Sequence, residues 1–129
     1  MKSLLRLQVA YAITGILYNA ASYATLQLHG FTLAPTAPIT GALVMGAYYL
    51  CLLPGFMGYR TAYRVLMCFA IAVFGYGGIV VHILNYPGNL HLYASTAAWA
   101  AAIGINAAGL VLNFLGASGL FLKKERSEG

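Results

Sequence analysis

Acidic side chains are almost absent from this chain of 129 residues, which contains only Glu125 and Glu128. Both stand close to the C-terminal end, so the long stretch before them carries no carboxylate. Carboxylates are the usual proton relays of ion-coupled carriers and frequent general bases of enzymes. Their absence argues against a proton-coupled carrier, and it leaves any metal or catalytic site without an acidic ligand or orienting group.

Charge of either sign is scarce. Charged residues make up 7% of the chain and hydrophobic residues 61%, whereas soluble domains carry about 25% charged residues. A chain with so little polar surface needs the lipid bilayer as its solvent. The seven Lys and Arg residues stand in small groups at the ends of apolar runs. No basic stretch interleaves with aromatic residues, so we expect no nucleic-acid partner.

Cysteine is also rare, and both Cys51 and Cys68 lie inside apolar runs. There is no CxxC motif and no disulfide framework. No glycine-rich phosphate loop is followed by a Lys, and nothing in the sequence orients His91 beside Ser95 for nucleophilic catalysis. We therefore assign no catalytic residue and expect a protein that is not an enzyme.

Four apolar segments fill the sequence, at about residues 4–26, 38–57, 65–84 and 97–122. Each is long enough to cross a hydrocarbon core of about 30 Å. The predicted fold is all-α: a polytopic membrane protein that forms a four-transmembrane-helix bundle, with residues 1–129 as a single membrane domain. The first segment is too long and too polar for a signal peptide, so we expect it to be retained.

The basic residues predict the orientation of these segments, because Lys and Arg are enriched on the cytoplasmic side of membranes. They occur near the N-terminus, between the second and third segments, and near the C-terminus, whereas the loops at 27–37 and 85–96 carry none. Both termini are therefore predicted to be cytoplasmic. No organelle signal is present, so the expected location is the bacterial inner (plasma) membrane.

Small and polar residues recur at three- and four-residue steps along each segment, a pattern typical of contact faces between membrane helices. In chain order, the predicted faces are Gln8, Tyr11, Gly15, Tyr18, Ser22 and Thr25; Gly41, Val44, Tyr48, Cys51 and Gly55; Cys68, Ala72, Gly75, Ile79 and His82; and Trp99, Ala102, Asn106, Gly109, Asn113 and Gly116.

These faces have two functional interpretations besides packing within the bundle. In the first, the protein is a non-enzymatic accessory or assembly subunit, or a homo-oligomer, that binds other membrane helices. In the second, polar groups line a facilitated pathway for a small neutral solute. The residues assigned to helix packing or to a substrate path are Gly15, Tyr18, Asn19, Trp99, Asn106, Gly109, Asn113 and Gly116. The same side chains serve either interpretation, so the sequence does not separate them.

The three histidines, His29, His82 and His91, all fall on the predicted non-cytoplasmic side. Neutral imidazoles bind zinc, copper and nickel, so a metal site formed by the three is one hypothesis. Their spacing matches no metal motif, and no Asp, Glu or Cys stands nearby. Histidines and tyrosines at this level of a membrane protein also occur simply as an interfacial belt.

A tetrapyrrole is the other cofactor hypothesis. Gly75 and Gly78 precede His82 by seven and four residues, which places all three on one face of a regular helix. A haem or chlorophyll ring ligated by His82 would fit the gap over the two glycines, giving a redox or pigment protein. The competing interpretation is a glycine-rich contact between helices that ends in an interfacial histidine.

Overall fold

The computed structural model describes residues 1–86 and 88–120, and every regular element in these ranges is a helix. The order is α1 (Lys2–His29), α2 (Pro38–Cys51), α3 (Leu53–Phe56), α4 (Arg60–Gly75), a π-helical turn η1 (Tyr76–Val80), α5 (Val81–Leu84), a short 3-10 helix η2 (Leu90–Leu92) and α6 (Thr96–Ser118). The prediction of an all-helical protein is confirmed.

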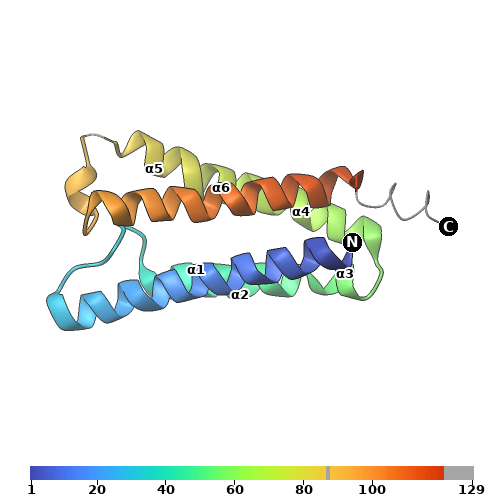
Figure 1. Ribbon diagram of the computed structural model, residues 1–129, viewed down its shortest axis with the longest axis horizontal. Helices are drawn as coiled ribbons and strands as arrows, with labels where there is room; N and C mark the ends of the chain where they lie inside the picture. Colours follow the sequence, from blue (N-terminus) through green and yellow to red (C-terminus); the bar gives the residue numbers. More distant parts are fainter. Residues whose placement is uncertain (87, 121–129) are drawn as a thin grey trace.

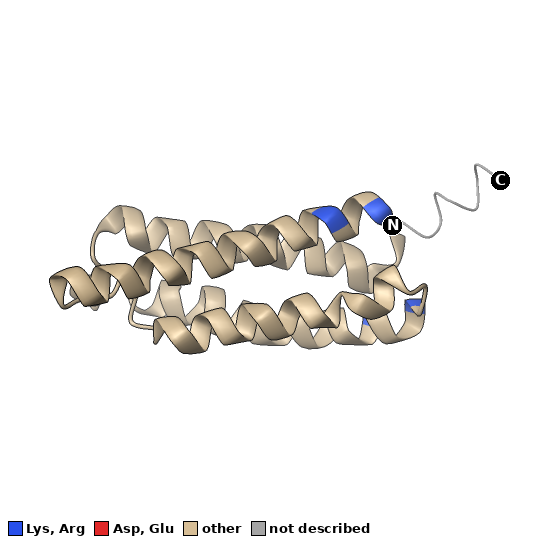
Figure 2. Ribbon diagram, turned by 90° about the horizontal axis from the view of Figure 1, so that it is seen from below, with Lys and Arg blue, Asp and Glu red and all other residues tan. Residues whose placement is uncertain are grey.

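The long helices α1, α2, α4 and α6 lie side by side along the long axis of the molecule (Figure 1). α1 packs mainly on α2 and α4 packs mainly on α6, while contacts between α1 and α6 join the two pairs. α3 extends α2 beyond a break, and η1 and α5 extend α4. The Lys and Arg residues in the described part of the chain all lie at one end (Figure 2). The bundle therefore has a basic end and an uncharged end.

Three helical segments are long and apolar enough to cross a membrane: Pro38–Phe56, Arg60–Leu84 and Thr96–Ser118. They correspond to the second, third and fourth predicted spans, with two differences at the boundaries. The third segment begins at Arg60, because the chain needs only Met57, Gly58 and Tyr59 to turn, with Gly58 at φ 85°. The fourth ends at Ser118, where Gly119 adopts φ 69°; residues 121 and 122 of the predicted span lie outside the described residues.

Proline and serine set two further helix boundaries. Pro54 has no N–H to donate to the preceding turn, and the second span is accordingly divided at Leu52 into α2 and α3. Ser95 caps α6, because its hydroxyl accepts a hydrogen bond from the Ala98 N–H at 3.0 Å. Both features follow directly from the local sequence.

The predicted contact faces of the first and fourth spans do face the interior. Gln8, Gly15 and Ser22 of α1 are buried, as are Gly109 and Asn113 of α6. Gln8 and Ser22 thus place polar side chains of α1 in the interior of the bundle. The outer surface of α1 carries large apolar side chains instead, among them Leu7, Ile13, Leu17 and Leu28.

The prediction for the third span was wrong over its first half. Cys68 and Ala72 are exposed, whereas Met67, Ala70 and Phe74 are buried. The cause is η1, whose π-helical turn contains an extra residue relative to an α-helical turn. The prediction assumed a regular α-helical period between His82 and Cys68. It therefore selected residues on the wrong side of α4.

Candidate functional site

A cavity of about 330 Å³ lies between α1, α2, the η1–α5 segment and α6, in the uncharged half of the bundle. Its wall is mostly apolar, with polar groups at a few positions, which is the usual composition of a small-molecule site. The polar side chains that line it are Tyr18, Asn19, Ser22, Thr36, Thr40, His82 and Asn106.

Glycines shape this cavity by letting two amide side chains lie flat against neighbouring helices. A Cβ atom at Gly41 would collide with the amide of Asn19, and one at Gly78 would collide with the amide of Asn106. Gly77, in contrast, has nothing within 4 Å of its Cβ position. The two asparagines thus line the cavity because glycine stands opposite each of them.

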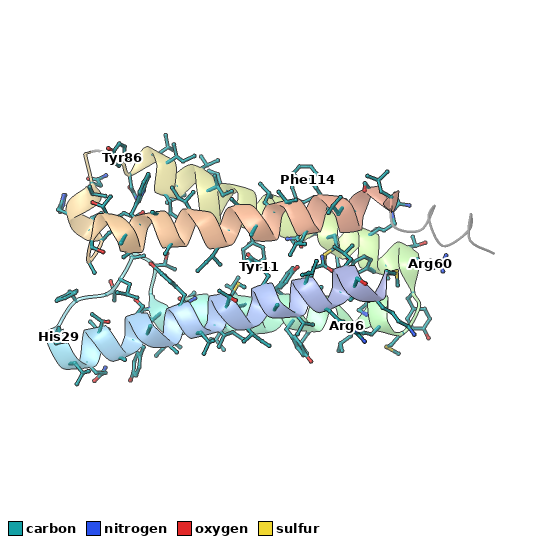
Figure 3. The ribbon with its side chains drawn as sticks, in the orientation of Figure 1. Arg6, Tyr11, His29, Arg60, Tyr86 and Phe114 are labelled. Atoms are coloured by element: carbon teal, nitrogen blue, oxygen red, sulfur yellow. The ribbon has the colours of Figure 1, made fainter. Side chains whose placement is uncertain are left out.

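Three aromatic rings pack together beside the cavity, and one of them, Phe74, lines it. Tyr11, Tyr48 and Phe74 pack edge to face, with centroid distances of 5.3, 5.8 and 5.4 Å, an arrangement that aromatic quadrupoles favour. Tyr11 lies midway along the bundle between the helices (Figure 3), and its hydroxyl donates to Oδ1 of Asn106 at 3.3 Å. We call Tyr11, Tyr48 and Phe74 the aromatic plug.

A relay of hydrogen bonds positions His82 at the other end of the cavity. Asn89 donates to Oδ1 of Asn85 at 3.3 Å, and Nδ2 of Asn85 donates to the Tyr93 hydroxyl at 3.3 Å. That hydroxyl lies 2.5 Å from Nδ1 of His82. The backbone of His82 is held as well, because the indole N–H of Trp99 donates to its carbonyl oxygen at 2.9 Å.

The relay accommodates a neutral His82 that accepts at Nδ1. The Tyr93 hydroxyl accepts from Asn85 and can donate its own hydrogen to Nδ1 of His82. In this tautomer Nε2 carries the N–H of the ring. Among the described residues, Nε2 makes no hydrogen bond. In this tautomer His82 therefore offers an N–H donor to a molecule in the cavity that it lines.

A second polar cluster lies on the far side of the aromatic plug, toward the basic end. Gln8 accepts from the Tyr63 hydroxyl at 2.6 Å and donates to Oδ1 of Asn113 at 3.2 Å and to the Met67 sulfur at 3.0 Å. Asn113 also accepts from the Tyr48 hydroxyl at 2.6 Å. Gln8 and Asn113 are completely buried, so this cluster ties the interior of the long helices together.

The structure divides the residues assigned to packing or a substrate path into two sets. Gly15, Tyr18, Asn19 and Asn106 line the cavity. Gly109 and Gly116 pack on Tyr11 and Tyr63, Asn113 belongs to the buried cluster, and Trp99 stacks on Tyr86 with centroids 4.8 Å apart.

The three histidines are not brought together. His82 is buried, whereas His29 is exposed at the C-terminal end of α1 and His91 is exposed in η2. His29 lies at the tip of α1 (Figure 3) and stacks on Phe31 with a centroid distance of 5.9 Å. In residues 1–86 and 88–120, no three His, Cys, Asp or Glu side chains form a group that could hold a metal ion.

The face formed by Gly75, Gly78 and His82 does not fit a tetrapyrrole. The space over Gly78 is filled by Asn106, and Leu110 approaches the Cβ position of Gly75 to 3.7 Å. Nδ1 of His82 is bound to Tyr93. Side chains of α6 thus lie against both glycines, where the hypothesis places the macrocycle.

Several residues of the site were not expected from the sequence. Tyr93 and Asn85 position His82, and Thr36 and Thr40 line the cavity. The aromatic plug depends on Phe74, which the α-helical count placed away from the interior. The only sequence signal was the glycine run at 75–78, which marks the irregular turn.

No family model, curated protein or solved structure matches the chain.

Proposed function

We propose that this protein is a membrane-embedded binding protein for a small neutral molecule that has an apolar body and a hydrogen-bond acceptor. The observation that carries the proposal is the cavity of about 330 Å³, apolar over most of its wall, with the free Nε2–H of His82 on its lining. A charged ligand does not fit this chemistry, because none of the described residues that line the cavity is Asp, Glu, Lys or Arg.

The walls of the cavity support entry from the lipid rather than from water. Val44 of α2 is 38% exposed and Val73 of α4 is 54% exposed, and both line the cavity. α2 and α4 contact one another far less than either contacts its main partner. In a bilayer this open side faces acyl chains, so a lipid-soluble molecule has direct access.

The aromatic plug separates the cavity from the basic end, so the observed conformation supports binding and not free passage. Transport of the same molecule across the bundle would require Tyr11, Tyr48 and Phe74 to move apart. We therefore propose a facilitated pathway only as an addition to the binding function. In that case movement of the aromatic plug would open the pathway.

Binding of coumarin tests the proposal, because this neutral bicyclic molecule carries a carbonyl acceptor. Wild-type protein in micelles should bind coumarin about three- to tenfold more tightly than naphthalene, which is similar in size but lacks an oxygen, since one net hydrogen bond contributes about 0.5–1.5 kcal/mol. His82→Phe should remove this preference while retaining naphthalene binding. Isothermal titration calorimetry of both probes measures the effect.

A matched pair of glycine variants shows whether the cavity is the binding site. Gly77→Leu places a side chain into open space on the cavity wall, whereas Gly104→Leu adds the same side chain to the exposed face of α6. Gly77→Leu should abolish binding of both probes, and Gly104→Leu should leave it unchanged. Equal binding by the two variants would refute the cavity as the site.

We further propose that α1 is a fourth membrane span and that the basic end faces the cytoplasm of a bacterial inner membrane. The support is the large apolar side chains on the outer surface of α1 and the burial of Gln8 and Ser22 in the interior. In a variant lacking Cys51 and Cys68, a cysteine introduced by Thr32→Cys should react with an impermeant maleimide in intact cells. Thr61→Cys should react only after permeabilisation, and the reverse pattern would overturn this orientation.

Assembly with a second copy of the chain is the alternative proposal. The predicted small-residue face of α6 is occupied within the bundle, but its outer face also carries small exposed residues at four-residue steps, Ala100, Gly104 and Ala108. Such spacing lets two membrane helices approach closely. Native mass spectrometry after gentle extraction decides the matter: multiples of 13.7 kDa support assembly, and a monomer at all concentrations rejects it.

A further inference from the structure

A second hollow, of about 320 Å³, lies at the basic end of the bundle. Lys2 and Arg6 reach it from the first turns of α1, and Arg60 reaches it from the first turn of α4. Figure 3 shows Arg6 and Arg60 at this same end of the molecule. Three cationic side chains from two helices that are distant in sequence therefore line one site.

The positive charge of this hollow favours the binding of an anion. Lys2 and Arg6 are four residues apart and so share one face of α1. The N-terminus of a long helix adds a partial positive charge on the same side. Lys2 and Arg6 carry like charges that repel each other at the hollow, and a bound anion would relieve that repulsion.

Besides these cations and Met1, the residues that line the hollow have no polar side chains: Leu5, Gly55, Phe56 and Gly58. Leu5 of α1 is 2% exposed and Phe56 of α3 is 52% exposed, and Gly55 precedes Phe56 in α3. A Cβ atom at Gly55 would come within 2.8 Å of the Leu5 side chain, so the floor is closely packed. A hydrophilic anion would bury no apolar surface against these residues. An amphiphile would contact both the apolar floor and the basic side chains of the hollow.

We propose that this hollow binds the phosphate headgroup of an anionic phospholipid. Lys2, Arg6 and Arg60 contact the phosphate oxygens, and Leu5 and Phe56 contact the first carbons of the acyl chains. Basic pockets between membrane helices bind anionic headgroups in this way, and guanidinium groups match the geometry of phosphate oxygens. The proposal is independent of the cavity at the other end.

Arg64 provides a matched control. It belongs to the same basic end, but it does not line the hollow, and its Nε donates to the carbonyl oxygen of Ala117 at 2.8 Å. Arg64→Gln and Arg6→Gln remove the same charge from the same end of the bundle. A difference between these two variants therefore reports the site rather than the overall charge.

Native mass spectrometry and thermal unfolding of the full chain in micelles test the proposal, with phosphatidylglycerol, phosphatidylcholine or inorganic phosphate added. Wild-type protein should retain phosphatidylglycerol and be stabilised by it, while phosphatidylcholine and phosphate have little effect. Arg6→Gln and Lys2→Gln should each weaken phosphatidylglycerol binding about fivefold, since one basic residue near an anionic surface contributes about that factor. Arg64→Gln should bind like the wild type.

Two results would overturn the proposal. Equal weakening by Arg6→Gln and Arg64→Gln would show that general charge attraction, and not this hollow, retains the lipid. Stabilisation by inorganic phosphate equal to that by phosphatidylglycerol would show a site for free phosphate instead. Lys2 is exposed, so Lys2→Gln keeps the test informative if Arg6→Gln is poorly produced.

Discussion

Gly109→Ala should destabilise the bundle by about 1–3 kcal/mol, the usual range for overpacking a closely fitted interior. A Cβ atom at this position would collide with the ring of Tyr11. Tyr11 cannot move aside freely, because it packs against both Tyr48 and Phe74 in the aromatic plug. Denaturant unfolding in micelles, followed through the fluorescence of Trp99, measures the change.

Gly46→Ala is the matched control for Gly109→Ala. Gly46 lies within α2 and has nothing within 4 Å of its Cβ position. Alanine is a better helix former than glycine by up to about 1 kcal/mol, so this variant should be as stable as the wild type or slightly more stable. Equal loss of stability in both variants would contradict the close approach of α1 and α6 at Gly109.

Gln8→Leu should destabilise the protein by about 2 kcal/mol, because it leaves buried polar groups without partners. The Tyr63 hydroxyl loses its acceptor, and Asn113 loses one of its two donors. Gln27→Leu makes the same substitution at an exposed position of α1 and should leave stability unchanged. The same unfolding experiment compares the two.

Combining Gln8→Leu with Tyr63→Phe shows whether the loss comes from the unpaired hydroxyl. Removing both partners of a buried hydrogen bond costs less than removing one. The double variant should therefore be less destabilised than the sum of the two single variants, by about 1 kcal/mol. Strict additivity would indicate that the two side chains do not interact in the folded protein.

The helical class and most helix positions could be predicted from the sequence because their causes are local. The apolar runs predict four spans, and for three of them the described residues contain a helical segment long and apolar enough to cross a membrane. Pro54 accounts for the break at Leu52, and Ser95 caps the start of α6. The interior face of α1 was also predictable, since Gln8, Gly15 and Ser22 are conspicuous against an apolar background. The crossing of the membrane by α1 stays a prediction.

The cavity and the buried cluster could not be predicted, because they depend on which helices meet. Gly41 accommodates Asn19 and Gly78 accommodates Asn106, but no property of one helix alone reveals these pairs. The hydrogen bond between Tyr63 and Gln8 joins residues that are 55 positions apart. For His82, the decisive partner, Tyr93, lies in a connection whose path the sequence does not determine.

The π-helical turn η1 has a consequence for how His82 came to face the cavity. Such a turn is equivalent to one residue inserted into an α-helix, and one residue corresponds to about 100° of rotation around the helix axis. Without the extra residue, α4 would keep its packing against α6, but α5 would be turned by that angle and the imidazole of His82 would point elsewhere. The π-helical turn therefore determines that the His82 side chain lies on the wall of the cavity.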